Sequence, residues 1–212
     1  MNESKINERS FIFASDMRTR DENKEQAIRS KAVEMVVREG FDGLSMHKLA
    51  KAAGVSPATI YIYFKDKEDL IIQVCQELSA KMADATLADF DPDMRFDEGL
   101  KRQWLNRARY CLENPVEMHF LEQIRYSPFN EKCHSKTDMR FRNAMKRFVH
   151  NAIDRGELQC LPVEVYWSVA FAPLYQLVKF HMSGQGLADS PFEMTEETID
   201  RTLEVVLRGL KP

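Results

Sequence analysis

SMHKLAKAAGVSPATIYIYF, residues 45–64, is the stretch that decides the fold. Ser45 can cap a first short helix, and Gly54 supplies the positive φ that a sharp turn requires. Ser56 followed by Pro57 combines an N-cap with a proline at the first helical position, which starts a second short helix. The segment therefore predicts a helix-turn-helix.

The end of this segment, IYIYF at residues 60–64, has the β-branched and aromatic composition of a strand. A lone strand in a helical chain would leave its backbone groups without partners. Keeping these residues helical costs only about 1–2 kcal/mol in total, so we expect a helix. Its inward face is Ile60 and Phe64, packed with Leu49, Ala53 and Val55, and the side chains facing away are Ala58, Thr59, Ile62 and Tyr63.

The rest of the chain has helical periodicity almost throughout, which predicts an all-α protein of about nine helices. The expected helices are 24–39, 67–87, 97–113, 115–126, 138–155, 163–182 and 195–209, besides the two short ones. Gly40 should stop the first of them, and Pro173 should kink the helix 163–182. Residues 88–99, with Pro92 and Gly99 as breakers before the helix that starts at about 97, and residues 127–135 are expected to be loops.

Composition excludes several classes. Charged residues make up 30% of the 212 residues and mean hydropathy is −0.43, which excludes an integral membrane protein. The four cysteines form no CxxC pair and no secretory signal precedes them, so we expect a reduced, cytoplasmic protein. HExxH, GxSxG, GxGxxG and P-loop motifs are absent, so neither an enzyme, a cofactor nor a metal is expected.

Charge is informative locally, because the net charge of −3 gives no global signal for nucleic acid. Between Leu44 and Lys65 there are three lysines and one histidine but no carboxylate. Such a window in an acidic chain favours a surface that meets phosphates. Charge alone favours a solvated helical hairpin, and the Ala-Gly-Val-Ser-Pro turn with exposed Thr and Tyr reverses that preference in favour of DNA.

Residues 45–64, followed by KDKEDL at 65–70, closely resemble the TetR (tetracycline-repressor-like) family of bacterial transcriptional regulators. The resemblance is specific over about residues 22–82. It implies an N-terminal arm (1–21), a three-helix DNA-binding domain (22–82) and a C-terminal effector-binding and dimerisation domain (83–212). It also implies a cytoplasmic homodimer that acts as a repressor, binds a palindromic operator and is released by a small, largely apolar molecule.

Carried onto this sequence, the resemblance assigns DNA contacts to residues of the two short helices and to the start of the next. Those expected to set the register on phosphates are Ser45, Lys48, Tyr61, Tyr63 and Lys67, and those expected at base edges are His47, Pro57, Ala58 and Thr59, with Ser56 as the cap. Ala58 stands where many members have glycine, and His47 where some place a base-reading arginine. Both departures affect the operator sequence rather than the fold.

The second half of the chain is rich in large side chains, most of which should be ordinary core. Candidate effector-pocket residues are Trp104, Tyr110, Met118, His119, Glu122, Tyr126, Phe148, Trp167, Phe171 and Tyr175. The apolarity of residues 163–182 and 199–210 exceeds what one core requires, which predicts a dimer interface. Its expected residues are Trp167, Leu174, Val178, His181, Ile199, Leu203, Val206 and Leu210.

Two points stay open in the sequence. Either Met17 is the true start, or residues 1–16 form an extra arm. Arg18 and Arg20, just before the first predicted helix, either reach the minor groove or belong to a frayed, solvated tail. The alternative function is an all-α small-molecule-binding protein or enzyme without a DNA function, and a helical adaptor is a third. The operator, the effector and the sign of regulation are not encoded in any pattern we recognise.

Overall fold

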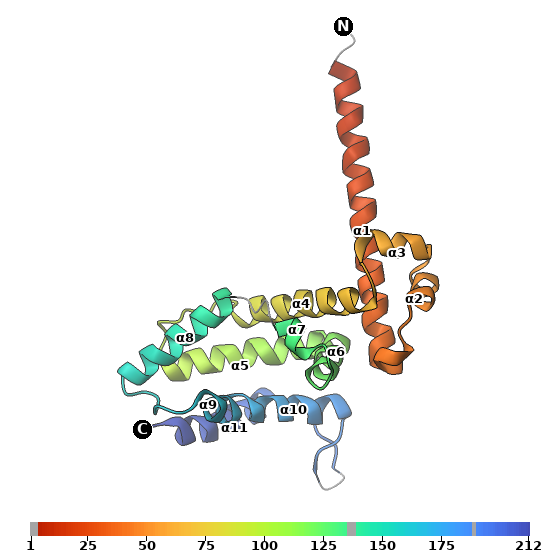
Figure 1. Ribbon diagram of the computed structural model, residues 1–212. Helices are drawn as coiled ribbons and strands as arrows, with labels where there is room; N and C mark the ends of the chain where they lie inside the picture. The colour runs from red at the N-terminus through yellow and green to blue at the C-terminus, as the bar shows by residue number, and fades with distance from the viewer. Residues whose placement is uncertain (1–3, 135–138, 188–189) are drawn as a thin grey trace. The chain divides into compact units, whose positions relative to one another are not determined.

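The structure, a computed structural model, describes residues 4–134, 139–187 and 190–212 (Figure 1). The regular elements of these residues are helices, which confirms the all-α class. They are α1 (Ser4–Gly43), α2 (Met46–Ala53), α3 (Pro57–Tyr63), α4 (Lys67–Thr86), α5 (Phe96–Glu113), α6 (Pro115–Arg125), α7 (Asn130–His134), α8 (Met139–Asp154), α9 (Val163–Ala170), α10 (Ala172–Ser183) and α11 (Glu196–Leu210). None of these helices is both long and apolar enough to cross a membrane.

The chain divides into two compact units, each assembled from two segments. Unit 1 is Met1–Glu77 with His119–Ser135, and unit 2 is Leu78–Met118 with Lys136–Pro212. Helices α4 and α6 each contribute residues to both units. Part of the sequence assigned to the C-terminal domain therefore folds with the N-terminal helices.

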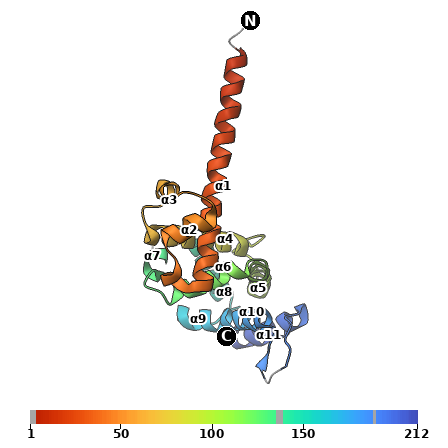
Figure 2. The same ribbon diagram turned by 90° about the vertical axis from the view of Figure 1, so that its right-hand side faces the viewer.

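Unit 1 is built around α1, with α2 and α3 beside it (Figure 2). Gly40, at φ 71°, interrupts α1 where the sequence predicts its stop. Helix α1 begins at Ser4, twenty residues before the predicted start, so the segment treated as an arm continues the helix. The buried side chains are apolar ones from α1 to α4, among them Ile28, Val36, Leu49, Ile60 and Leu70.

The second segment of unit 1, which begins at His119, covers the end of α1. The Phe41 ring lies 6.5 Å from that of Phe120 in α6 and 5.1 Å from that of Phe129, measured between centroids. Gln123 Nε2 donates to the Val37 carbonyl at 3.3 Å. The short helix α7 lies where the sequence predicts only a loop, because Phe129 and the buried Cys133 give this segment an apolar face.

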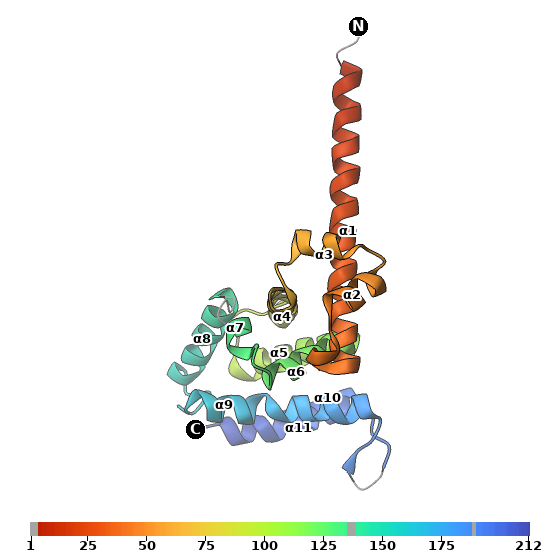
Figure 3. The same cartoon turned by 45° about the vertical axis from the view of Figure 1, so that its right-hand side comes forward.

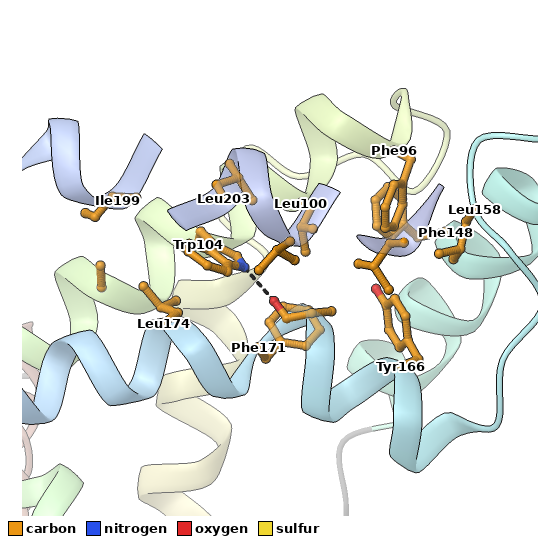
Figure 4. Close-up of a cluster of buried hydrophobic side chains, with 14 of the residues drawn as sticks. Phe96, Leu100, Trp104, Phe148, Leu158, Tyr166, Phe171, Leu174, Ile199 and Leu203 are labelled. Carbon is orange, nitrogen blue, oxygen red and sulfur yellow. Dashed lines mark hydrogen bonds between the residues drawn. The ribbon is translucent and has the colours of Figure 1, made fainter. Parts of the chain in front are cut away.

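Unit 2 has its apolar core between α5 and the last helices, with α10 and α11 side by side (Figures 1 and 3). Figure 4 shows the centre of this core, with Phe96, Trp104, Phe148 and Phe171 among its large side chains. Gly99 lies inside α5, not in the preceding loop, and a Cβ there would come within 2.4 Å of the Phe148 ring. A glycine is required because the ring packs directly on the helix backbone.

The predicted helix 163–182 is two helices rather than one kinked helix. Phe171 leaves the helical region at φ −126°, two residues before Pro173. Proline lacks the N–H that would bond the Val169 carbonyl, and its ring clashes there. The Ala170 carbonyl, which a continuous helix would bond to Leu174, instead accepts the buried Trp104 Nε1–H at 2.7 Å (Figure 4). The break thus provides the acceptor that a buried indole needs.

The side chains predicted to face a partner subunit are mostly buried within their own chain. Leu174, Val178, Leu203, Val206 and Leu210 are all less than a tenth exposed, as is Ile199. Trp167 and His181 are half-buried, and His181 Nδ1 accepts the Met194 N–H at 3.1 Å. Packing of α9, α10 and α11 on α5 therefore buries these apolar side chains within one chain, and the predicted interface stays a prediction.

Candidate nucleic-acid interface

Two short helices with side-chain caps form the predicted helix-turn-helix. Ser45 Oγ accepts the Lys48 N–H at 3.2 Å and caps α2, and Ser56 Oγ accepts the Thr59 N–H at 3.1 Å and caps α3. Gly54 ends α2 in the left-handed region at φ 67°. Pro57 occupies the first turn of α3. Each local feature that the sequence indicates is therefore present.

Burial decides which face of α3 is available. Ile60 and Phe64 are fully buried, and the guanidinium of Arg29 in α1 lies 5.0 Å from the centre of the Phe64 ring. On the other side, Tyr61 is 55% and Ile62 76% exposed. Seven residues cannot hold a helix alone, so the buried pair fixes its orientation.

Two of the predicted contact residues already have partners within the chain. Thr59 Oγ1 and Ser56 Oγ lie 2.8 Å apart and share a hydrogen bond. The half-buried Tyr63 donates its hydroxyl to the Asp21 carbonyl at 3.3 Å. Burial raises the pKa of Tyr63, and the charge of Asp21 adds to this, so the phenol stays a donor. Ala58, Tyr61, His47 and Lys48 are exposed on the same two helices.

One acidic side chain lies close to this surface. Lys48 Nζ is 3.7 Å from Glu39 Oε2, near the end of α1. The hydrogen bond from Arg38 lowers the pKa of Glu39, with Lys48 contributing, so the carboxylate stays charged at neutral pH. The pair is exposed and weak, and a phosphate can compete with it for the lysine.

The start of α4 carries Lys67, the other lysine for which a phosphate contact is predicted. Asp66 Oδ1 accepts the Asp69 N–H at 2.8 Å, and Asp69 Oδ2 accepts the Lys65 N–H at 2.9 Å. The bond from Lys65 is the main cause of the lowered pKa of Asp69. Lys67 is the first residue of α4 and half-buried. A cation is disfavoured at a helix N-terminus by about 0.3–1 kcal/mol, so helix stability does not explain Lys67.

The candidate effector-pocket residues are divided between the two units. Trp104, Phe148 and Phe171 are fully buried in the unit 2 core, while Trp167, Tyr175 and Met118 pack against it. The buried Tyr110 donates to Glu117 Oε2 at 2.9 Å. By contrast, His119, Glu122 and Tyr126 belong to unit 1 and are exposed, Tyr126 to 83%. Those three therefore do not join the unit 2 core.

Sequence reasoning missed two polar side chains in the unit 2 core, Gln103 and Arg107, which are 0% and 2% exposed. Both lie on the buried face of α5, at spacings of three and seven residues from Leu100. This spacing places both residues on the apolar face of a helix and is the sequence signal for their burial.

Comparison with known proteins agrees with this geometry. Residues 28–74 match the family model described as bacterial regulatory proteins, tetR family. The chain is 31% identical over 178 residues to an uncharacterized HTH-type transcriptional regulator of Haemophilus influenzae, which covers 84% of this chain and 90% of the relative. It is 28% identical over 130 residues to the fatty acid metabolism regulator protein of Bacillus subtilis, covering 61% of this chain and 60% of that protein.

Among solved structures, a TetR family transcription regulator from Marinobacter aquaeolei superposes with a TM-score of 0.80 at 31% identity, covering 92% of this chain and 98% of that one. The match extends over both units, not only over the capped helices. With the exposed face of α3 and the carboxylate-free window around it, these likenesses identify the chain as a helix-turn-helix transcriptional regulator that belongs to the TetR family.

Proposed function

We propose that the protein is a homodimeric repressor that binds a palindromic operator and is released from it by a small molecule. The observation that carries the DNA-binding part is the orientation of α3, whose buried Ile60 and Phe64 leave Tyr61 and Ala58 at the surface. Palindromic operators follow from two-fold symmetry, because each subunit presents one recognition helix to one major groove.

On the operator, we assign phosphate contacts to Ser45, Lys48, Tyr61 and Lys67, and to Tyr63 if its bond to Asp21 is exchanged. Base edges face His47, Pro57, Ala58 and Thr59. Few of these side chains can form bidentate hydrogen bonds, so direct readout is modest and uses methyl contacts with thymine from Ala58 or Thr59. Shape and deformability of the operator then supply the rest of the specificity.

The dimer interface is assigned to the outward faces of α10 and α11. On α11, Val205 is 67% exposed, and it shares a helix face with Thr198 and Thr202 before it and Gly209 after it, without a charge among them. Thr202 bonds its own helix through the Thr198 carbonyl, which leaves a small and satisfied surface. Such a stripe allows a second helix to approach closely.

The effector is assigned to unit 2, whose core holds the large aromatic side chains. A relative named for fatty acid metabolism supports a molecule with an apolar body. Release requires the effector to bind more tightly, by about 5.5 kcal/mol, to one of two spacings of the DNA-binding domains in the dimer. We assign the coupling between the effector and DNA to residues 67–87 and also to α6, because α4 and α6 each contribute residues to both units.

The test is a titration of DNA from upstream of the protein's own gene, followed by fluorescence anisotropy, with a shuffled duplex of equal length as the matched control. We expect saturable binding by two chains per site and at least tenfold preference over the shuffled duplex. Equal affinity for both duplexes would reject operator recognition. Binding of small molecules without any effect on the duplex would instead favour a regulator of another kind.

A further inference from the structure

The core of unit 2 contains a charge that the chain itself does not neutralise. The guanidinium of Arg107 in α5 is buried at 2% exposure, and no carboxylate among the described residues pairs with it. Transfer of an arginine out of water is costly unless hydrogen bonds and an opposite charge compensate it. Arginine keeps its proton under all ordinary conditions, so it cannot escape this cost by becoming neutral.

Three aromatic rings surround this guanidinium. Its central carbon lies 4.6 Å from the centre of the Phe171 ring, 5.4 Å from that of Trp167 and 5.7 Å from that of Phe141. Rings cover the faces of a guanidinium through cation–π attraction, but they accept no conventional hydrogen bonds from its edges. The edges of Arg107 are therefore left for other groups.

One edge is occupied and the other is not. Nη1 donates to the Tyr175 hydroxyl oxygen at 2.8 Å, whereas Nε and Nη2 have no partner. The N–H groups of Nε and Nη2 point in parallel from the same side of the guanidinium, which is the fork that meets the two oxygens of a carboxylate. The unpaired atoms are thus the pair that would bind one carboxylate in a bidentate manner.

Neighbouring buried polar groups also lack hydrogen-bond partners. Gln103 lies one helical turn before Arg107, and neither atom of its side-chain amide has a partner. The Tyr166 hydroxyl is also buried without a partner, and in Figure 4 it points towards the other side chains of the core. Tyr175 accepts from Arg107 and retains its own O–H to donate. All four side chains belong to unit 2.

We propose that Arg107, with Gln103, Tyr166 and Tyr175, binds the carboxylate of an organic acid whose apolar body lies against the aromatic side chains of unit 2. The proposal deepens the proposed function by naming the effector class, and it rests on effector binding in unit 2. An apolar body is required because Trp167, Phe171 and Phe141 surround the charge and would gain nothing from a hydrated inorganic ion. A neutral or cationic effector would leave the guanidinium uncompensated.

The test measures binding in the absence of DNA, by calorimetric titration of the full chain with decanoate and phenylacetate. The alcohols of the same carbon skeletons, decan-1-ol and 2-phenylethanol, are the neutral probes, and inorganic phosphate is the probe without an apolar body. We expect at least one of the acids to bind, and to do so about thirtyfold or more tightly than its alcohol. Failure of both acids, equal binding of acid and alcohol, or equal binding of phosphate would each overturn the proposal.

Arg107→Met is the decisive variant, with Arg102→Met, an exposed arginine of the same helix, as the matched control. An unpaired buried charge does not stabilise a fold, so R107M should unfold in urea at the wild-type midpoint or above it. R107M should also bind the acid about thirtyfold or more weakly than the wild type, whereas R102M should bind it with wild-type affinity. A lowered midpoint together with unchanged acid binding would show that Arg107 serves the fold alone.

A second measurement does not depend on any variant folding. Decanoate labelled with carbon-13 at its carboxyl carbon reports its own ionisation by NMR. Bound beside Arg107, the acid should titrate at a lower pH than the free acid, because the guanidinium favours the carboxylate. An unshifted or raised titration would overturn the assignment. These measurements contain no operator, so they test acid binding alone. If the acid binds unit 2 but does not release the operator in a separate titration, the proposed repression is rejected and the assignment of Arg107 still holds.

Discussion

Lys67 shows how a single residue can be informative because it is locally unfavourable. It begins α4, where Glu68 and Asp69 suit the positive end of the helix dipole and a lysine does not. Arg107 is the corresponding case in the interior, where a charge lacks its partner. Departures from local rules of this kind concentrate at functional sites, because stability alone gives no reason to keep them.

Replacement of Lys67 by alanine should weaken binding to all duplexes rather than change the preferred sequence. A lost phosphate contact reduces counterion release, so the slope of log affinity against log salt concentration should flatten by about one unit. Anisotropy titrations over a range of salt concentrations measure this slope. Lys81→Ala, on the same helix, is the control, and an unchanged slope for K67A would contradict the assigned contact.

The cysteines should differ sharply in reactivity. Burial raises the pKa of the Cys111 thiol to about 11, a rise that the charge of Arg107 partly opposes, and Cys160 is exposed. Below its raised pKa the Cys111 thiol stays neutral and unreactive, so at mildly alkaline pH a thiol reagent should label Cys160 alone in the native protein. Mass spectrometry of tryptic peptides locates the label, and full denaturation should expose all four thiols. Rapid native labelling of Cys111 would contradict its burial.

At the scale of elements, short helices here depend on their ends and on one buried pair. Helix α3 has seven residues, and its first turn is held by Ser56. Its orientation comes from Ile60 and Phe64, so the sequence could predict both its start and its inward face. It could not predict that Tyr63 bonds Asp21, because the two residues are 42 positions apart and meet only through packing.

Ser56→Ala should remove the cap of α3 and lower the free energy of unfolding by about 1 kcal/mol. Urea unfolding followed by circular dichroism measures the change. Ser56→Asp should restore most of this stability, because aspartate also caps, yet it should weaken DNA binding by placing a carboxylate in the lysine-bearing window. Equal stability of all three proteins would mean that the cap contributes nothing here.

Trp104→Phe tests the break between α9 and α10. The variant keeps an aromatic ring but deprives the Ala170 carbonyl of its indole donor, so unfolding should become about 1–3 kcal/mol easier. Trp167→Phe is the matched control, because no hydrogen bond of its indole is seen among the described residues. If the two variants lose equal stability, the cost is that of the smaller ring rather than of the lost bond.

At the scale of the whole molecule, the proposed dimer determines whether two recognition helices can reach one operator. Val205→Glu places a charge on the outward face of α11, and Leu187→Glu, at an equally exposed apolar residue, is its control. We expect V205E to sediment as a monomer that remains folded and binds the operator at least tenfold more weakly, because single half-sites bind poorly. A dimeric V205E would move the interface to another surface.

The sequence by itself determined the local events: the caps at Ser45 and Ser56, the turn at Gly54, the stop at Gly40 and the helical class. Each follows from φ/ψ preferences or from hydrogen bonds within a few residues, so it needs no knowledge of the fold. Only the tertiary structure decided which surfaces the apolar faces of the helices pack against. It buried the predicted interface residues of α10 and α11 in their own core, brought α6 and α7 to α1, and left Nε and Nη2 of Arg107 without a hydrogen-bond acceptor. Those outcomes depend on which faces meet in three dimensions, because packing between distant segments is fixed by the fold and not by the spacing along one helix.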